Sequence, residues 1–221
     1  MRFTFIFILT CFFVNCNQHK NRSASEKIPG TKFELYIPLH SNDTRYERDL
    51  NAYTYKKKLT NLLSLKALEN GADSFELRFW KVGSLFDPII LYILKKSPNK
   101  NWSNLHFQLY RGTSWNSEEP EIDSLAVQKV WPRMINWDEY IKSLNLDSLW
   151  VTPSQREVID ESFGAVDGYS YFIELASSSK YRFLNYYVPD RLQNVELNHR
   201  RIIDFQNNLR DGILYNGIIN P

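Results

Sequence analysis

The hydrophobic pattern along the chain predicts a sheet of about five strands. Five segments either alternate between apolar and polar residues or are rich in aromatic and branched side chains, and both patterns are typical of strands. These segments are residues 74–80, 89–96, 104–111, 169–176 and 180–188. The last two predict the clearest element, a hairpin with a three-residue turn at 177–179. Because that connection is tight, we expect antiparallel pairing.

The turn length also predicts which residues of the hairpin face each other. A three-residue turn places Leu175 opposite Tyr181. The same register places Glu174 opposite Arg182, which predicts an ion pair between them. Apolar and charged pairs then segregate by face, and a slip of one residue would lose this agreement.

Helices are predicted before and after strands along the chain. The segments with helical spacing or capping residues are 51–70, 136–144, 153–162 and 194–210. Gly71 follows the first helix at the position of a left-handed cap. Asn136, with Glu139 three residues later, resembles a capping box. We therefore predict an α+β fold, in which a mainly antiparallel sheet carries helices packed on it.

The N-terminus has the pattern of a secretory leader. The apolar run from Phe3 to Val14 is about half of the ~20 residues that a membrane-spanning helix needs, but it fits a signal peptide. The residues after Cys16 are polar and offer nothing to pack, which indicates a tether. The predicted organisation is a signal peptide over 1–15, a tether over 16–30 and a single domain over 31–221.

Phe13, Val14, Asn15 and Cys16 resemble the lipobox of bacterial lipoproteins. The strict pattern has Leu three residues before the cysteine and a small residue just before it, and this chain departs from it at Phe13 and Asn15, as relaxed versions do. The resemblance implies that Cys16 becomes the first residue of the mature chain and carries lipid, palmitate included. At about 0.8 kcal/mol per buried methylene, several acyl chains would hold the protein on a membrane nearly permanently.

Outside the lipobox the resemblance is one of style. A polar tether followed by one aromatic-rich domain is similar to small envelope lipoproteins of Bacteroidota. Asn17 does not resemble the Asp that retains many lipoproteins at the inner membrane, so we expect the outer one. No motif implies an activity by resemblance.

Composition excludes some partners. The chain has 27 basic and 25 acidic residues, so its formal net charge of +2 indicates no nucleic-acid partner. Its densest basic cluster is Lys56, Lys57 and Lys58, which we interpret as a solvated helix face. The two cysteines lie in or next to the leader, so the domain has no internal disulfide and must be stabilised by packing.

No cluster of residues predicts a metal, a cofactor or a nucleophile. His40, His106 and His199 are scattered and lack the spacing of zinc ligands. The acidic segment 112–123 lacks the alternating oxygen ligands of a calcium loop, and the chain has no Gly-x-Gly. We therefore assign no catalytic residue, and we interpret the acidic segment as an exposed loop.

Two residue classes remain as candidates for function. Glu76 and Glu174 lie at polar strand positions and could form a glycosidase pair, although each has an arginine nearby and is expected to be ion-paired. Exposed indoles can stack on sugars or anchor a protein, with packing over the core as the alternative. If the domain has a binding face, we expect Trp80, Trp102 and Trp115 to form it.

The leading hypothesis is a lipid-anchored envelope protein whose domain binds a protein or glycan without catalysis. The alternative is an anchored, glycan-directed hydrolase that uses Glu76 and Glu174. In a third possibility, ordinary signal peptidase removes the leader and the protein is secreted. In a eukaryotic host, Asn21, Asn42 and Asn101 would then be glycosylation acceptors.

Overall fold

The computed structural model describes residues 44–84, 86–112, 122–132, 136–155, 168–191 and 196–215. The side chains of residues 44–50, 122, 127–132 and 214–215 are outside this description. The predicted leader, lipobox and tether also lie outside the described residues.

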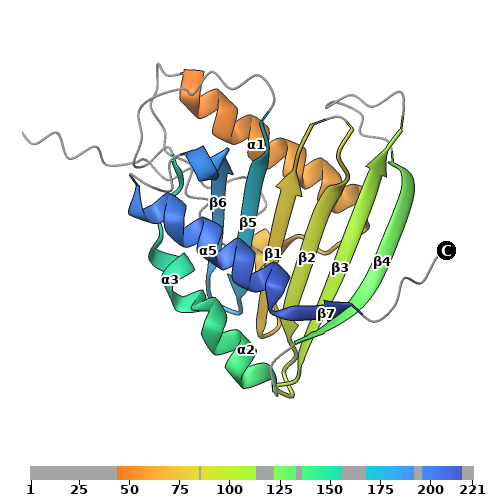
Figure 1. Ribbon diagram of the computed structural model, residues 1–221, viewed down its shortest axis with the longest axis vertical. Coiled ribbons are helices and arrows are strands. Elements are labelled where there is room, and N and C mark those ends of the chain that lie inside the picture. Colours follow the sequence, from red (N-terminus) through yellow and green to blue (C-terminus); the bar gives the residue numbers. More distant parts are fainter. Residues whose placement is uncertain are drawn as a thin grey trace, which may run out of the picture.

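Seven strands form one sheet in which all neighbouring strands are antiparallel (Figure 1). In chain order they are β1 (Phe75–Val82), β2 (Ile89–Lys96), β3 (Trp102–Arg111), β4 (Ile122–Pro132), β5 (Ser170–Ser177), β6 (Tyr181–Tyr187) and β7 (Ile213–Tyr215). Their order in space is β6-β5-β1-β2-β3-β4-β7. The predicted α+β fold with an antiparallel sheet is confirmed, and β4 and β7 are the strands that the sequence pattern missed.

Helices cover both faces of the sheet. They are α1 (Thr44–Leu62), α2 (Trp137–Leu144), α3 (Leu146–Val151) and α5 (Leu197–Asp211), with short 3-10 turns η1 (Leu68–Asn70) and η2 (Pro189–Arg191). Figure 1 shows α2, α3 and α5 in front of the sheet and α1 behind it. No helix in this part of the chain is long and apolar enough to cross a membrane.

Each face of the sheet therefore has its own core. Leu77 and Phe79 of β1 pack toward α2 and α5 in one core, whereas Trp80 lies with residues of α1 in the other. The alternation of residues 74–80 is typical of a strand with one face in water, but both faces of β1 are buried. Glu76 and Arg78, on its polar side, are 7% and 1% exposed, and Arg78 donates to the Lys66 carbonyl of the segment that follows α1.

The predicted first helix is interrupted. Helix α1 ends at Leu62, and Ser64 then adopts a φ of 52°. The chain continues into η1, which Gly71 follows with a φ of 88°. The Gly71 N–H donates to the Leu68 carbonyl and closes this turn. A positive φ favours glycine, but Gly71 ends this separate turn with a ψ of 166°, so the predicted left-handed cap on the first helix is wrong.

The predicted cap of α2 and the predicted buried face of α5 are confirmed. The Asn136 side chain accepts the N–H of Glu139 at 2.9 Å. Ile202, Phe205 and Leu209 of α5 are all buried in the front core. The helix predicted over 153–162 lies largely outside the described residues, and α3 precedes it.

The β5–β6 hairpin has a different register from the predicted one. Glu174 lies opposite Phe183, one residue away from Arg182. The cause is the turn: Ser177 Oγ accepts the N–H of Lys180 at 3.0 Å, and the Ser177 N–H donates to the Lys180 carbonyl at 2.8 Å. These bonds close the turn around two residues instead of three. The predicted Glu174–Arg182 ion pair is wrong, because a slip of one residue puts the two side chains on opposite faces.

Candidate functional site

The two carboxylates singled out from the sequence are both buried beside cations. Glu76 Oε1 lies 2.8 Å from the Arg78 guanidinium, and its Oε2 lies 3.7 Å from Lys95 Nζ on the neighbouring strand. Glu174 Oε1 lies 2.7 Å from Lys56 Nζ. Both carboxylates therefore take part in ion pairs inside the back layer of the domain.

Lys56 is the largest departure from the sequence-based interpretation. It was assigned to a solvated helix face, but its side chain is 1% exposed. Its Nζ also lies 3.2 Å from Glu69 Oε1, so one ammonium serves two carboxylates. Burying a lone charge costs several kcal/mol, and a lysine is buried in this way only when it is paired. Lys57, the next residue, is exposed as predicted.

Three aromatic side chains complete this buried lysine network, which we define as Tyr53, Lys56, Glu69, Trp80, Glu174 and Tyr181. The Tyr53 hydroxyl donates to Glu69 Oε1 at 2.5 Å. The Tyr181 hydroxyl donates to Glu174 Oε1 at 3.0 Å, and Trp80 Nε1 donates to Glu174 Oε2 at 3.4 Å. Helix α1, η1, β1, β5 and β6 each supply at least one member.

The network has a definite protonation pattern. Burial and the nearby carboxylates raise the pKa of Tyr53 and of Tyr181, so both hydroxyls remain donors. Burial alone would raise the pKa of Glu69, but the Lys56 charge and the Tyr53 hydrogen bond lower it below its ordinary value. Glu69 is therefore ionised at neutral pH.

Arg182 lies on the front face of the hairpin. Its guanidinium donates to the Thr152 carbonyl at 2.6 Å, which ties β6 to the end of α3. Arg182 thus stabilises the packing of α3 on the sheet. The sheet separates its side chain from Glu174.

The candidate tryptophans do not form one face. Trp80 is fully buried, so its indole cannot contact a partner at the surface. Trp102 is half-buried and packs on the opposite core, with its ring centroid 5.8 Å from that of Phe75 and 5.1 Å from Lys96 Nζ. Trp115 lies outside the described residues. Trp102 is the one of the three that the described structure places partly at the surface.

A pocket that sequence reasoning missed lies where β1, β2 and β5 meet at one end of the sheet. Its volume is about 390 Å³, and Lys81, Ser84, Asp87, Pro88, Ile90 and Tyr169 contribute to its wall. We call it the strand-end pocket. Its wall combines a cation, a carboxylate, hydroxyl groups and apolar surface, which is the composition of many ligand sites.

The loop between β1 and β2, residues 83–88, is held in place on one side of this pocket. Arg111 of β3 donates to the carbonyls of Ser84 and Gly83, the latter at 3.2 Å. Within the loop, Ser84 Oγ bonds to Asp87 Oδ2 at 3.1 Å. A Cβ on Gly83 would lie 2.8 Å from that same Asp87 oxygen, so a larger residue there would displace the Asp87 side chain.

This held loop presents an aromatic ring to solvent. The Phe86 side chain is 98% exposed, more than any other large hydrophobic residue described. Leaving a phenyl ring in water forgoes about 1.5–3 kcal/mol of burial free energy. The sequence signal for this exposed ring is an apolar pair flanked by turn residues, in the segment from Gly83 to Pro88.

On the other side of the pocket, Tyr169 is held by charged and aromatic neighbours. Lys81 Nζ lies 4.8 Å from its ring centroid, and the ring of Tyr171 lies 5.0 Å away. Burial and a hydrogen bond with Asp190 raise the pKa of Tyr169, which keeps the hydroxyl protonated. The pocket therefore has a rigid wall with both hydrogen-bond donors and acceptors.

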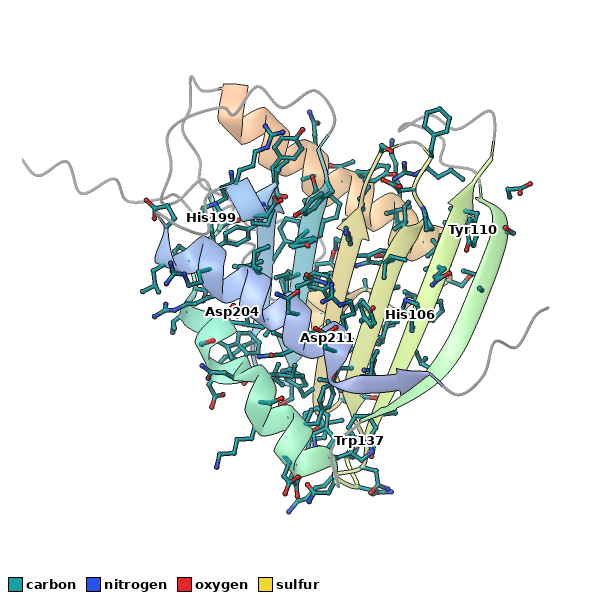
Figure 2. All side chains as sticks on the ribbon, in the orientation of Figure 1. His106, Tyr110, Trp137, His199, Asp204 and Asp211 are labelled. Carbon is teal, nitrogen blue, oxygen red and sulfur yellow. The ribbon has the colours of Figure 1, made fainter. Side chains whose placement is uncertain are left out.

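Metal-binding geometry is not found in the part of the chain described. No group of three or more histidine, cysteine or acidic side chains comes together there. Figure 2 shows His106 on β3 and His199 on α5, on separate elements. His106 packs its ring 4.7 Å from that of Tyr92, and burial lowers the pKa of His199 to about 4, so that residue is neutral.

Comparison of the chain with models of protein families, with curated proteins and with solved structures found no match.

Proposed function

We propose that the protein is a lipid-anchored component of the bacterial cell envelope, attached through Cys16, preferentially at the outer membrane. Its folded domain binds a protein or glycan partner and has no catalytic role. The lipobox-like sequence from Phe13 to Cys16 supports the anchor, and the polar segment that follows supports a tether between membrane and domain.

The exposure of Phe86 beside the strand-end pocket carries the binding part of the proposal. Bonds from Arg111 to the carbonyls of Gly83 and Ser84, and from Ser84 to Asp87, fix the chain on both sides of this ring. A rigid aromatic anchor next to a pocket is the arrangement found at the energetic centre of binding interfaces. A partner that covers the ring recovers the burial free energy that its exposure forgoes.

Glu76 and Glu174 are each paired with a cation. This favours a binding function over the alternative function as a carboxylate hydrolase. A glycosidase needs its two carboxylates at the wall of a cleft that holds the substrate, whereas Glu76 is bonded to Arg78 and Glu174 to Lys56 in the interior. Both groups also lie between α1 and the sheet, at 7% and 0% exposure, where a substrate would have to displace the helix.

Site-specific photocrosslinking in living cells tests this proposal. A photoreactive amino acid at position 86 should give an adduct in the envelope fraction, and digestion with proteinase or glycosidase identifies it as protein or glycan. Position 151 is the matched control, because Val151 is 78% exposed but lies at the end of α3. Adducts at 86 that diminish in Arg111→Met support the site. No adduct at 86, or equal adducts at 86 and 151, would reject it.

A further inference from the structure

The buried lysine network brings an amine and two carboxyl groups together in a dry part of the domain. Lys56 Nζ lies 2.7 Å from Glu174 Oε1 and 3.2 Å from Glu69 Oε1. The three side chains are 1%, 0% and 4% exposed. Lys56 and Glu174 are 118 positions apart in the sequence, so only the fold brings them together.

We propose that Lys56 and Glu174 condense to form an intramolecular amide bond that joins α1 covalently to β5. Glu69 is the base and proton carrier of the reaction. This inference is independent of the proposed binding function, since it concerns a different layer of the molecule.

The nucleophile is the amine of Lys56, which must first lose a proton. Glu69 contacts the same Nζ and is ionised, so it can accept that proton. Transfer of the proton leaves two neutral groups in place of two charges, so the neutral amine forms without a new charge in the dry interior. The rings of Tyr53 and Phe183, with centroids 4.5 Å and 5.8 Å from Nζ, supply that environment.

The electrophile is the carboxyl carbon of Glu174. Tyr181 donates to one of its oxygens and Trp80 lies within 3.4 Å of the other. Donors fixed on both oxygens can stabilise the negative charge that develops when the amine attacks the carbon, as donors do in an oxyanion hole. Tyr181 remains protonated because burial and the carboxylates raise its pKa.

The reaction balances without any co-reactant. The bond from Lys56 Nζ to the Glu174 carboxyl carbon forms, and one carbon–oxygen bond of Glu174 breaks. Two of the three ammonium protons leave with that oxygen as water, and the third stays on the amide nitrogen. Glu69 takes a proton from nitrogen and returns it to the departing oxygen, so it ends in its original state.

Proximity lowers the barrier that makes the same reaction slow in water. Groups held in reacting geometry reach effective molarities of about 10⁵–10⁸ M, and a dry interior opposes the reverse hydrolysis. The bond would connect the sheet to α1, the described element nearest in sequence to the predicted lipid anchor. A force applied through the tether would then act on a covalent bond between α1 and β5, which would prevent α1 from being pulled away from the sheet.

Peptide mass spectrometry of the full-length protein tests the bond. The protein is purified from the membrane fraction, denatured and digested with trypsin, which does not cut after an acylated lysine. An unlinked chain therefore gives segments 49–56 and 157–180, and a linked chain gives segment 49–57 attached to segment 157–180. We expect the linked product, with a mass equal to the sum of segments 49–57 and 157–180 minus one water. Separate, unmodified segments in the wild-type protein would overturn the proposal, whatever the variants do.

Variants test the role of each group. Lys57→Arg, at the exposed neighbouring position, should retain the joined peptide, whereas Lys56→Arg should lose it. Glu69→Gln, which keeps the size of the side chain but cannot carry a proton, should reduce the joined fraction at least tenfold in protein that is still folded by circular dichroism. If Glu69→Gln is not folded, Glu69→Asp replaces it and should form the bond more slowly. An undiminished joined peptide in the folded Glu69 variant would overturn the role of Glu69.

Discussion

Replacing Lys56 by methionine should destabilise the domain strongly. Methionine has a similar length but no charge, so the variant leaves Glu69 and Glu174 close together without a cation. Removing one partner of a buried ion pair costs about 3–5 kcal/mol, because the remaining charge is neither solvated nor paired. For a chain of this size, each kcal/mol lowers the melting temperature by about 2–4 °C, so the expected decrease is about 6–20 °C.

Urea denaturation followed by tryptophan fluorescence measures this effect. Lys57→Met is the control, since Lys57 is exposed on the same helix turn and should change stability by less than about 0.5 kcal/mol. Adding Glu69→Gln and Glu174→Gln to Lys56→Met should recover part of the loss, because no unpaired charge then remains buried. If the amide has formed in the wild type, the loss is larger still. A Lys56→Met variant as stable as the Lys57→Met control would refute the assignment of this network to the interior.

Three further predictions concern stability. Folding lowers the pKa of Glu69, so its contribution to the free energy of unfolding is present above the ordinary pKa of 4.5 and is lost as the pH falls through the folded pKa. Glu69→Gln should therefore flatten the acid side of a plot of the urea midpoint against pH. Folding also lowers the pKa of His199 from 6.5 to about 4, so stability should fall as the pH decreases from 6.5 to 4, and His199→Phe should remove this slope in the same assay. Gly168→Ala should cost about 1–3 kcal/mol by thermal melting, because its Cβ would collide with Tyr187 and lie 2.5 Å from Val188 Cγ2; an unchanged melting temperature would contradict that packing.

Local patterns were sufficient to predict many elements. The bounds of β2 agree with the apolar segment 89–96, and the Asn136 cap and the inward face of α5 follow from spacing alone. In these segments the residues that determine the structure lie within a few positions of one another. Strand β4 was missed because it follows an acidic, polar segment, and β7 is too short to show a period.

Long-range interactions account for what the sequence could not reveal. Nothing in the spacing of Lys56 indicates that its partners are 13 and 118 residues away, so a lysine on a helix was assigned to solvent. The hairpin register depended on Ser177 Oγ, a side-chain bond that turn-length reasoning does not include. Trp80 was named for a binding face because the cover provided by α1 is a tertiary property that spacing does not show.

The N-terminal peptide of the membrane-bound protein provides the most direct test of the proposed function. Its mass should correspond to a chain that begins at Cys16 and carries diacylglyceryl and acyl groups, and Cys16→Ala should lose both the adduct and retention in the membrane fraction. A mature chain that begins at another residue and is found in the soluble fraction would contradict the lipid anchor and the envelope location that follows from it.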